Sequence, residues 1–96
     1  MKVLVSDNLG KVGIEMLEAE EGLTVDVRTG LASAELAEII DAYEGLIIRS
    51  ATRVTEGLLA RATRLKVVGR AGIGLDNVDI PAATRHGVVV MNTPDG

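Results

Sequence analysis

Short apolar runs alternate along the chain with longer stretches in which apolar residues recur at helical spacing. Five of the runs predict strands: KVLVS (2–6), LTVDV (23–27), GLIIR (45–49), KVVGR (66–70) and VVVMN (88–92). Most of these runs are unbroken rather than alternating, which favours strands covered on both faces. The pattern therefore predicts a parallel sheet.

Four helices are predicted between the strands. Their apolar stripes are Leu9, Val12, Met16 and Leu17 in the first, Leu36, Ile39, Ile40 and Tyr43 in the second, and Leu58, Leu59 and Ala62 in the third. The predicted N-caps of the second, third and fourth helices are Ser33, Thr55 and Asp79, and Pro81 lies in the first turn of the fourth. Gly22, Gly45 and Gly87 mark the ends of the first, second and fourth helices.

Strict alternation of strand and helix predicts one α/β domain over residues 1–96, doubly wound, with helices on both faces of a five-stranded sheet. The usual strand order is 2-1-3-4-5, and ligands bind at the carboxyl ends of the strands, beside the switch between strands 1 and 3. The loops expected at that edge are SDN (6–8), RSAT (49–52) and RAGIG (70–74).

Charge is distributed unevenly along the chain. Its formal net charge is −4, but seven of the ten Lys and Arg side chains lie in residues 49–96, and six of them fall between Arg49 and Arg70. A small anion would be drawn to that region, although Arg61, Arg64 and Lys66 can equally form a solvated helix face. The negative net charge and the single aromatic residue, Tyr43, argue against binding of nucleic acid.

Other function classes are excluded by residues that the sequence lacks. It has no cysteine and one histidine, His86, so neither a metal cluster nor a Ser/His/Asp arrangement can be assembled, and catalysis by these residues alone is doubtful. His86 is expected to be structural, at the end of the fourth helix. The first apolar run is too short for a signal peptide or a membrane span, so a cytoplasmic location is expected.

The glycine-rich loop supplies only part of a nucleotide-binding motif. Gly72 and Gly74 give G-x-G, but Asn77 stands at the third position and the loop follows the fourth strand, so neither a dinucleotide loop nor a Walker loop is present. Its backbone N–H groups can bind an anion, with Arg70 and Arg49 adding charge, or the glycines can simply form a tight turn.

Several polar residues near this loop have two interpretations. Arg49 can contact an anion or pair with Asp7 or Asp76, while Ser50 and Thr52 can donate to an anion or turn the chain. Asp76 and Asp79 are interpreted as turn and cap residues. A phospho-acceptor receiver domain shares the topology, but Arg49 and Ser50 stand where its acceptor aspartate belongs.

Two stretches together carry a family resemblance: GLIIRSATRVT (45–55) and LKVVGRAGIGLDNVDIPAATRHGVVVMNTP (65–94). They resemble the N-terminal part of the D-isomer-specific 2-hydroxyacid dehydrogenases. The resemblance implies a flavodoxin-like substrate-binding domain, whose chain crosses near Asn92 into an NAD-binding Rossmann domain. That domain and a returning C-terminal segment would follow Gly96, as would the catalytic arginine, glutamate and histidine, so no catalytic residue is expected in this chain.

The resemblance also implies site residues and an activity. Arg49, Ser50 and Arg70 would lie by the substrate, backbone amides of Gly72, Ile73 and Gly74 would receive its carboxylate, and Ile73, often threonine in the family, would border the cofactor. The parent enzyme would transfer hydride from the C2 carbinol of 3-phosphoglycerate to NAD in serine biosynthesis.

The chain alone is expected to bind small anions weakly, with no turnover and no bound NAD. Without the returning segment, an apolar patch is expected to cause self-association. Two alternatives are a free-standing anion-binding or interaction module of the same fold, and a chain deliberately stopped at TPDG (93–96).

Overall fold

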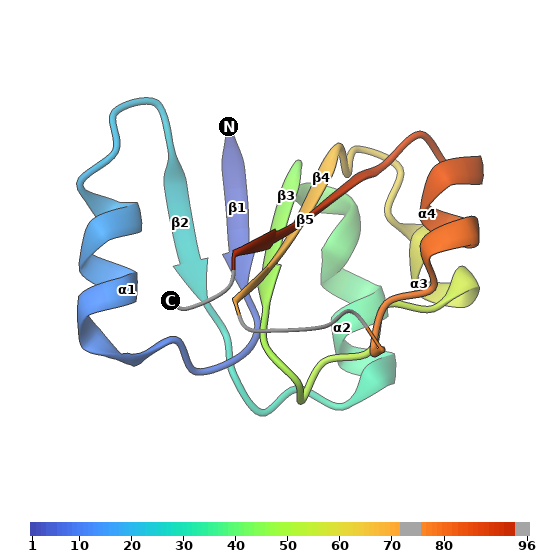
Figure 1. The fold of residues 1–96 in the computed structure, drawn as a ribbon, viewed down its shortest axis with the longest axis horizontal. Coiled ribbons are helices and arrows are strands. Elements are labelled where there is room, and N and C mark those ends of the chain that lie inside the picture. The colour runs from blue at the N-terminus through green and yellow to red at the C-terminus, as the bar shows by residue number, and fades with distance from the viewer. Residues whose placement is uncertain (72–75, 94–96) are drawn as a thin grey trace.

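The sheet is five-stranded and entirely parallel, in the order β2-β1-β3-β4-β5 (Figure 1). The computed structural model describes residues 1–71 and 76–93, without the side chains of Val12 and Thr93. The strands are β1 (Lys2–Val5), β2 (Thr24–Val27), β3 (Gly45–Ile48), β4 (Val67–Ala71) and β5 (Val89–Thr93). The fold class and strand order predicted from the sequence are confirmed.

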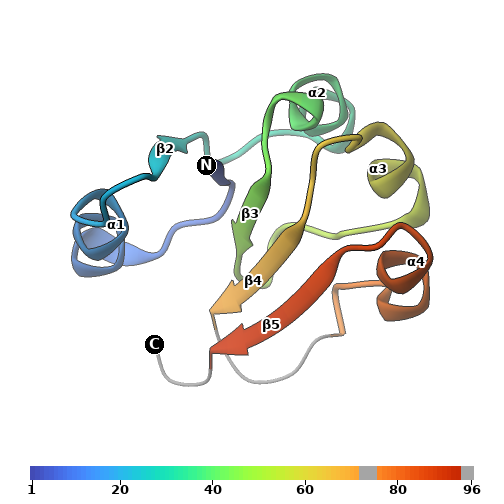
Figure 2. The same cartoon turned by 90° about the horizontal axis from the view of Figure 1, so that it is seen from above.

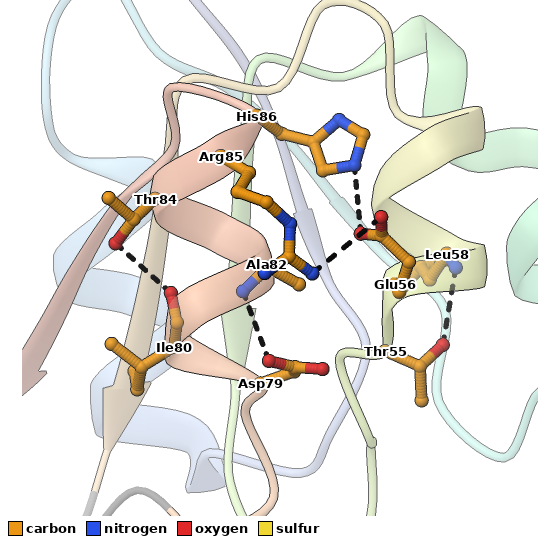
Figure 3. Close-up of polar contacts among 9 residues, drawn as sticks. All are labelled: Thr55, Glu56, Leu58, Asp79, Ile80, Ala82, Thr84, Arg85 and His86. Atoms are coloured by element: carbon orange, nitrogen blue, oxygen red, sulfur yellow. Dashed lines mark hydrogen bonds and ion pairs between the residues drawn. The ribbon is translucent and has the colours of Figure 1, made fainter.

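The helices begin and end close to their predicted positions. They are α1 (Gly10–Glu18), α2 (Ser33–Ile39), which continues as the 3-10 helix η1 (Ile40–Ala42), α3 (Glu56–Arg61) and α4 (Ile80–Arg85). Thr55 and Asp79 cap α3 and α4 as predicted: the Thr55 hydroxyl accepts from the Leu58 N–H at 3.2 Å, and the Asp79 carboxylate accepts from the Ala82 N–H at 3.0 Å (Figure 3).

The predicted cap of α2 is wrong by one residue. The N-cap is Ala32, and Ser33 is already the first helical residue. The Glu35 side chain reaches back and accepts the Ala32 N–H at 2.9 Å. This bond is the half of a capping box in which the N3 carboxylate accepts the N–H of the cap residue, and it places the start of the helix at Ala32.

The core lies on one face of the sheet, beneath α2, α3 and α4 (Figure 2). Its fully buried large side chains include Leu4, Leu46, Ile48 and Val68 from the sheet and Leu59 from α3. On the other side, α1 lies beside the edge strand β2 (Figure 1). The predicted burial of the α1 stripe is therefore only partly correct: Leu9 and Leu17 are half-buried, but Met16 is 68% exposed.

The face of β4 and β5 that points away from α2, α3 and α4 is open. Val89 is 59% exposed and Met91 is 51% exposed, and Ile47 and Val67 beside them are only half-buried. We call these four residues the open face. Its apolar character explains why the sequence predicted strands covered on both faces, and its exposure agrees with the expected apolar patch.

Candidate anion-binding site

The carboxyl ends of β1 and β3 lie side by side, which brings two loops together. Register pairs Val5 with Ile47, and the Ser6 N–H continues the ladder by donating to the Ile47 carbonyl at 3.1 Å. The next residues of each strand, Asp7 and Arg49, therefore meet although 42 positions separate them. Polar groups of the loops after β1 and β3 therefore meet at the edge of the sheet where the topology rule places a ligand.

Asp7 is the buried centre of this edge, with only 5% of its surface exposed. One carboxylate oxygen accepts the backbone N–H of Arg49 at 2.7 Å and that of Thr52 at 3.0 Å. The other accepts the Thr52 hydroxyl at 2.6 Å, and this hydroxyl also contacts that of Ser6 at 2.8 Å. The desolvated carboxylate is therefore compensated by three donors from a single loop.

Asn77 connects that loop to β4. Its side-chain N–H₂ donates to the carbonyls of Arg49 and Thr52, both at 2.6 Å, and its Oδ1 accepts from Nε of Arg70 at 2.7 Å. The backbone around it is fixed, since Val54 pairs with Val78 and donates its N–H to the Asn77 carbonyl at 2.8 Å. One amide side chain thus uses both ends to fix two arginine-bearing segments.

The two arginines lie at the carboxyl ends of neighbouring strands: Arg49 directly follows β3, and Arg70 lies in β4. Arg70 is half-buried and opposite Ile48 in the β3–β4 register, so it lies next to the strand end that carries Arg49. Arg49 is exposed, and its guanidinium donates to the Asn8 carbonyl at 3.3 Å. Two cations at one strand edge suit a ligand with negative oxygens, because the guanidinium fork matches carboxylate and phosphate.

Of the predicted site residues, Arg49, Ser50 and Arg70 come together at this edge. Gly72, Ile73 and Gly74 lie outside the described residues, so their predicted role stays a prediction. Within the described part of the chain, no ion pair joins Arg49 to Asp7 or Asp76. Of the two interpretations of Thr52, the structure favours the internal one, since its hydroxyl donates to Asp7.

The sequence interpretation missed the network around Asp7 and Asn77. From the sequence, Asp7 is a predicted partner for an arginine side chain, whereas in the structure its carboxylate accepts backbone amides. A signal was present: Asp7 directly follows an apolar strand, where a buried carboxylate needs several donors. In the sequence, Asn77 stands out only as the residue at the third glycine position of the dinucleotide motif.

The shifted pKa values lie at the opposite, amino-terminal edge of the sheet. Burial raises the pKa of Tyr43 to about 12, assisted by its hydrogen bond to Asp26 at 2.7 Å. The backbone N–H of Lys2 lowers the pKa of Glu44 by donating to its carboxylate, and Lys66 adds to this. These groups stabilise the strand starts and do not contact the anion edge.

His86, predicted to be structural, connects α3 and α4. Its Nε2 lies 2.9 Å from the Glu56 carboxylate, which also pairs with Arg85 at 3.8 Å (Figure 3).

In the described residues, no group of three or more His, Asp or Glu side chains could hold a metal ion. No described helix is long and apolar enough to cross a membrane.

A family model and individual relatives point to the same family of dehydrogenases. The family model described as "D-isomer specific 2-hydroxyacid dehydrogenase, catalytic domain" matches residues 3–96. D-3-phosphoglycerate dehydrogenase of Synechocystis sp. is 50% identical over 99% of this chain, and that of Archaeoglobus fulgidus is 43% identical over all of it. The chain spans only 17% and 18% of the length of these two relatives.

A solved structure has the same fold. The NAD⁺-bound 3-phosphoglycerate dehydrogenase of Entamoeba histolytica superimposes with a TM-score of 0.89 at 28% identity, over 98% of this chain and 33% of that one.

Proposed function

Because the chain belongs to the D-isomer-specific 2-hydroxyacid dehydrogenase family, we propose that it forms the N-terminal portion of the substrate-binding domain of a D-3-phosphoglycerate dehydrogenase. The parent enzyme would oxidise the 2-hydroxyl of 3-phosphoglycerate with NAD, in the cytoplasm, as a step of serine biosynthesis. The cofactor domain and the segment that completes this domain would lie outside the 96 residues. Residues 1–96 would supply one wall of the active site.

One observation carries this proposal: the Asn77 side chain contacts both arginine-bearing segments. It fixes Arg70 through Nε and the Arg49 backbone through its carbonyl, so two cations are held at one edge. 3-Phosphoglycerate carries a carboxylate and a phosphate, and each suits a guanidinium. We assign Arg49 and Ser50 to one anionic group and Arg70 to the other, with backbone amides of residues 72–74 adding donors to the carboxylate.

The described residues do not fit NAD. A dinucleotide loop places its pyrophosphate on glycine amides directly after the first strand. Here β1 is followed directly by Ser6, Asp7 and Asn8, so no glycine amide stands where that loop would begin, and the Asp7 carboxylate already accepts donors of residues 49–52. Ile73, the residue proposed to border the nicotinamide, lies outside the described residues. NAD binding is therefore assigned to the rest of the parent enzyme, and none is expected in this chain.

Turnover is likewise not expected from the chain alone. The oxidation needs a base for the hydroxyl proton, and the single histidine, His86, is paired with Glu56 on the helix layer. The chain is proposed to bind small anions weakly and to leave proton and hydride transfer to residues beyond Gly96.

The proposal is tested by recording backbone amide NMR spectra of the 96-residue chain during titration with D-3-phosphoglycerate. Signals of residues 49–52 and 70–74 are expected to move, and Arg49→Ala should remove most of the movement. Arg64→Ala is the matched control, because Arg64 is an exposed cation outside the site. Movement confined to residues 61–66, or equal loss in both variants, would contradict the site assignment.

The open face supports a second, independent proposal about the isolated chain. Val89 and Met91 expose apolar surface on a strand at the end of the sheet. Exposed contiguous apolar surface is unfavourable in water and drives association. We propose that the 96-residue chain self-associates through this face, which a further segment of the parent enzyme would otherwise cover.

A further inference from the structure

The loop that carries Arg49 and Ser50 is held from its inner side by a buried carboxylate. We propose that Asp7 is a positioning residue for anion binding: it fixes the Arg49–Thr52 loop in the shape that receives the ligand. This inference rests on the proposed function, because it concerns the same anion. It assigns a role to a residue that would not itself touch the substrate.

The hydrogen bonds of the loop divide it into two sides. The N–H groups of Arg49 and Thr52 donate to one oxygen of Asp7. The intervening N–H groups of Ser50 and Ala51 donate to no other residue that the structure describes, and both residues are exposed. Asp7 therefore takes up the first and last amides of the turn and leaves the two middle ones, with the Arg49 side chain, for an external acceptor.

A chain of hydroxyls strengthens this arrangement. Since the Thr52 hydroxyl gives its proton to Asp7 at 2.6 Å, the contact at 2.8 Å with Ser6 requires Ser6 to donate. The donors run from Ser6 to Thr52 to Asp7, and each bond polarises the next. Because Ser6 and Asp7 are 4% and 5% exposed, little water is present to replace these bonds if one member is removed.

An internal carboxylate would repel a nearby anion if its charge were uncompensated. Here three donors from the loop converge on Asp7, and two are backbone amides that cannot rotate away. A loop that ordered itself only on ligand binding would lose affinity through the cost in conformational entropy. Because Asp7 already holds the loop in one shape before the ligand binds, this entropic cost does not reduce the affinity.

The test measures D-3-phosphoglycerate affinity by amide NMR of the 96-residue chain in five variants. Asp7→Ala removes the acceptor, whereas Asp7→Asn keeps an oxygen that can accept both amides. Thr52→Val removes only the two hydrogen bonds of the Thr52 hydroxyl, to Asp7 and Ser6, and provides a second probe if Asp7→Ala does not fold. Asp41→Asn, in η1 at the other end of the sheet, controls for the lost charge.

The positioning role predicts that Asp7→Ala weakens binding by about tenfold or more and Thr52→Val by about threefold, while Asp7→Asn and Asp41→Asn stay within about twofold of the unchanged chain. Leu65→Val, in the core and away from the loop, should lower the melting temperature without changing affinity. A loss of affinity that simply followed melting temperature, Leu65→Val included, would reduce Asp7 to a structural residue and overturn the inference.

The failures of the two proposals are distinguishable. If the unchanged chain shifts at residues 49–52 but Asp7→Ala or, should that variant not fold, Thr52→Val binds equally well, the positioning role is wrong and the proposed site stands. If the unchanged chain shows no shift there, the proposed site is wrong and the role of Asp7 in anion binding is wrong with it.

Discussion

The carboxylate of Asp7 and the hydroxyl of Thr52 lie 2.6 Å apart although 45 residues separate them in sequence. The contact exists because β1 and β3 are adjacent and end at the same edge of the sheet. It turns a loop between two elements into a fixed support for Arg49 and Ser50. The site therefore depends on the pairing of strands as much as on the residues that would meet the ligand.

Asn77→Ala is expected to lower the free energy of unfolding by about 1–3 kcal/mol, because it removes the hydrogen bonds that the Asn77 side chain makes to the Arg49 and Thr52 carbonyls and to Arg70 Nε. Asn77→Asp should lower the free energy of unfolding further, since a carboxylate cannot donate hydrogen bonds to the Arg49 and Thr52 carbonyls. Urea unfolding followed by circular dichroism measures both. The neighbouring, exposed Asp76→Ala is the control, and an equal loss there would contradict the role of Asn77.

Tyr43 is expected to make stability fall between pH 10 and 12. Its folded pKa of about 12 exceeds its ordinary value of 10.0, so the folded state retains the phenol proton longer than the unfolded state does. The stabilisation is complete below pH 10.0 and is lost as the pH rises to about 12. Tyr43 is the single tyrosine, so the near-ultraviolet absorbance of tyrosinate follows this group alone.

Tyr43→Phe is the matched variant for that experiment, because it keeps the ring and removes the titrating group. Its stability should decline less steeply over the same pH range than that of the unchanged chain. Equal slopes for the two proteins would show that other groups, such as lysines, cause the decline.

Removal of either helix cap is expected to cost about 1 kcal/mol. Thr55→Ala and Asp79→Ala each leave a first-turn N–H of α3 or α4 without its side-chain acceptor (Figure 3). Thr84→Ala is the control, because the Thr84 hydroxyl only donates to the Ile80 carbonyl within α4 and caps nothing. Thermal unfolding measures all three, and a loss for Thr84→Ala as large as for the caps would contradict the assignment.

Polar substitution of the open face is expected to reduce self-association. Val89→Thr keeps a β-branched residue in the strand, and Met91→Lys places a charge on the exposed edge. The double variant should be monomeric by light scattering at a concentration where the unchanged chain associates. Thr63→Lys, exposed elsewhere, should change nothing. A monomeric unchanged chain at high concentration would refute the proposal.

The strands, their order and the caps Thr55 and Asp79 were predictable because they depend on local patterns and on one general rule of α/β topology. The juxtaposition of Arg49 and Arg70 followed from the same rule, since both residues end neighbouring strands. The rest depends on tertiary detail. The first residue of α2 was mispredicted because Ala32, which has no side-chain acceptor, is the N-cap and its N–H is bonded by Glu35. The exposure of Met16 depends on the tertiary packing of α1, which the spacing of apolar residues does not give. The network of Asp7 was not predictable because its donors belong to a distant segment.

The parallel connection between β1 and β3 also bears on the order of folding. Every contact between Asp7 and the Arg49–Thr52 loop spans at least 42 residues, so it can form only after the first strand has closed a long stretch of chain. A chain in which β3, α3 and β4 had assembled without β1 would carry Arg49 on a loop that lacks its hydrogen bonds to Asp7, while Arg70 would already lie in β4. Anion affinity, followed during refolding, would then report the moment at which the first strand docks.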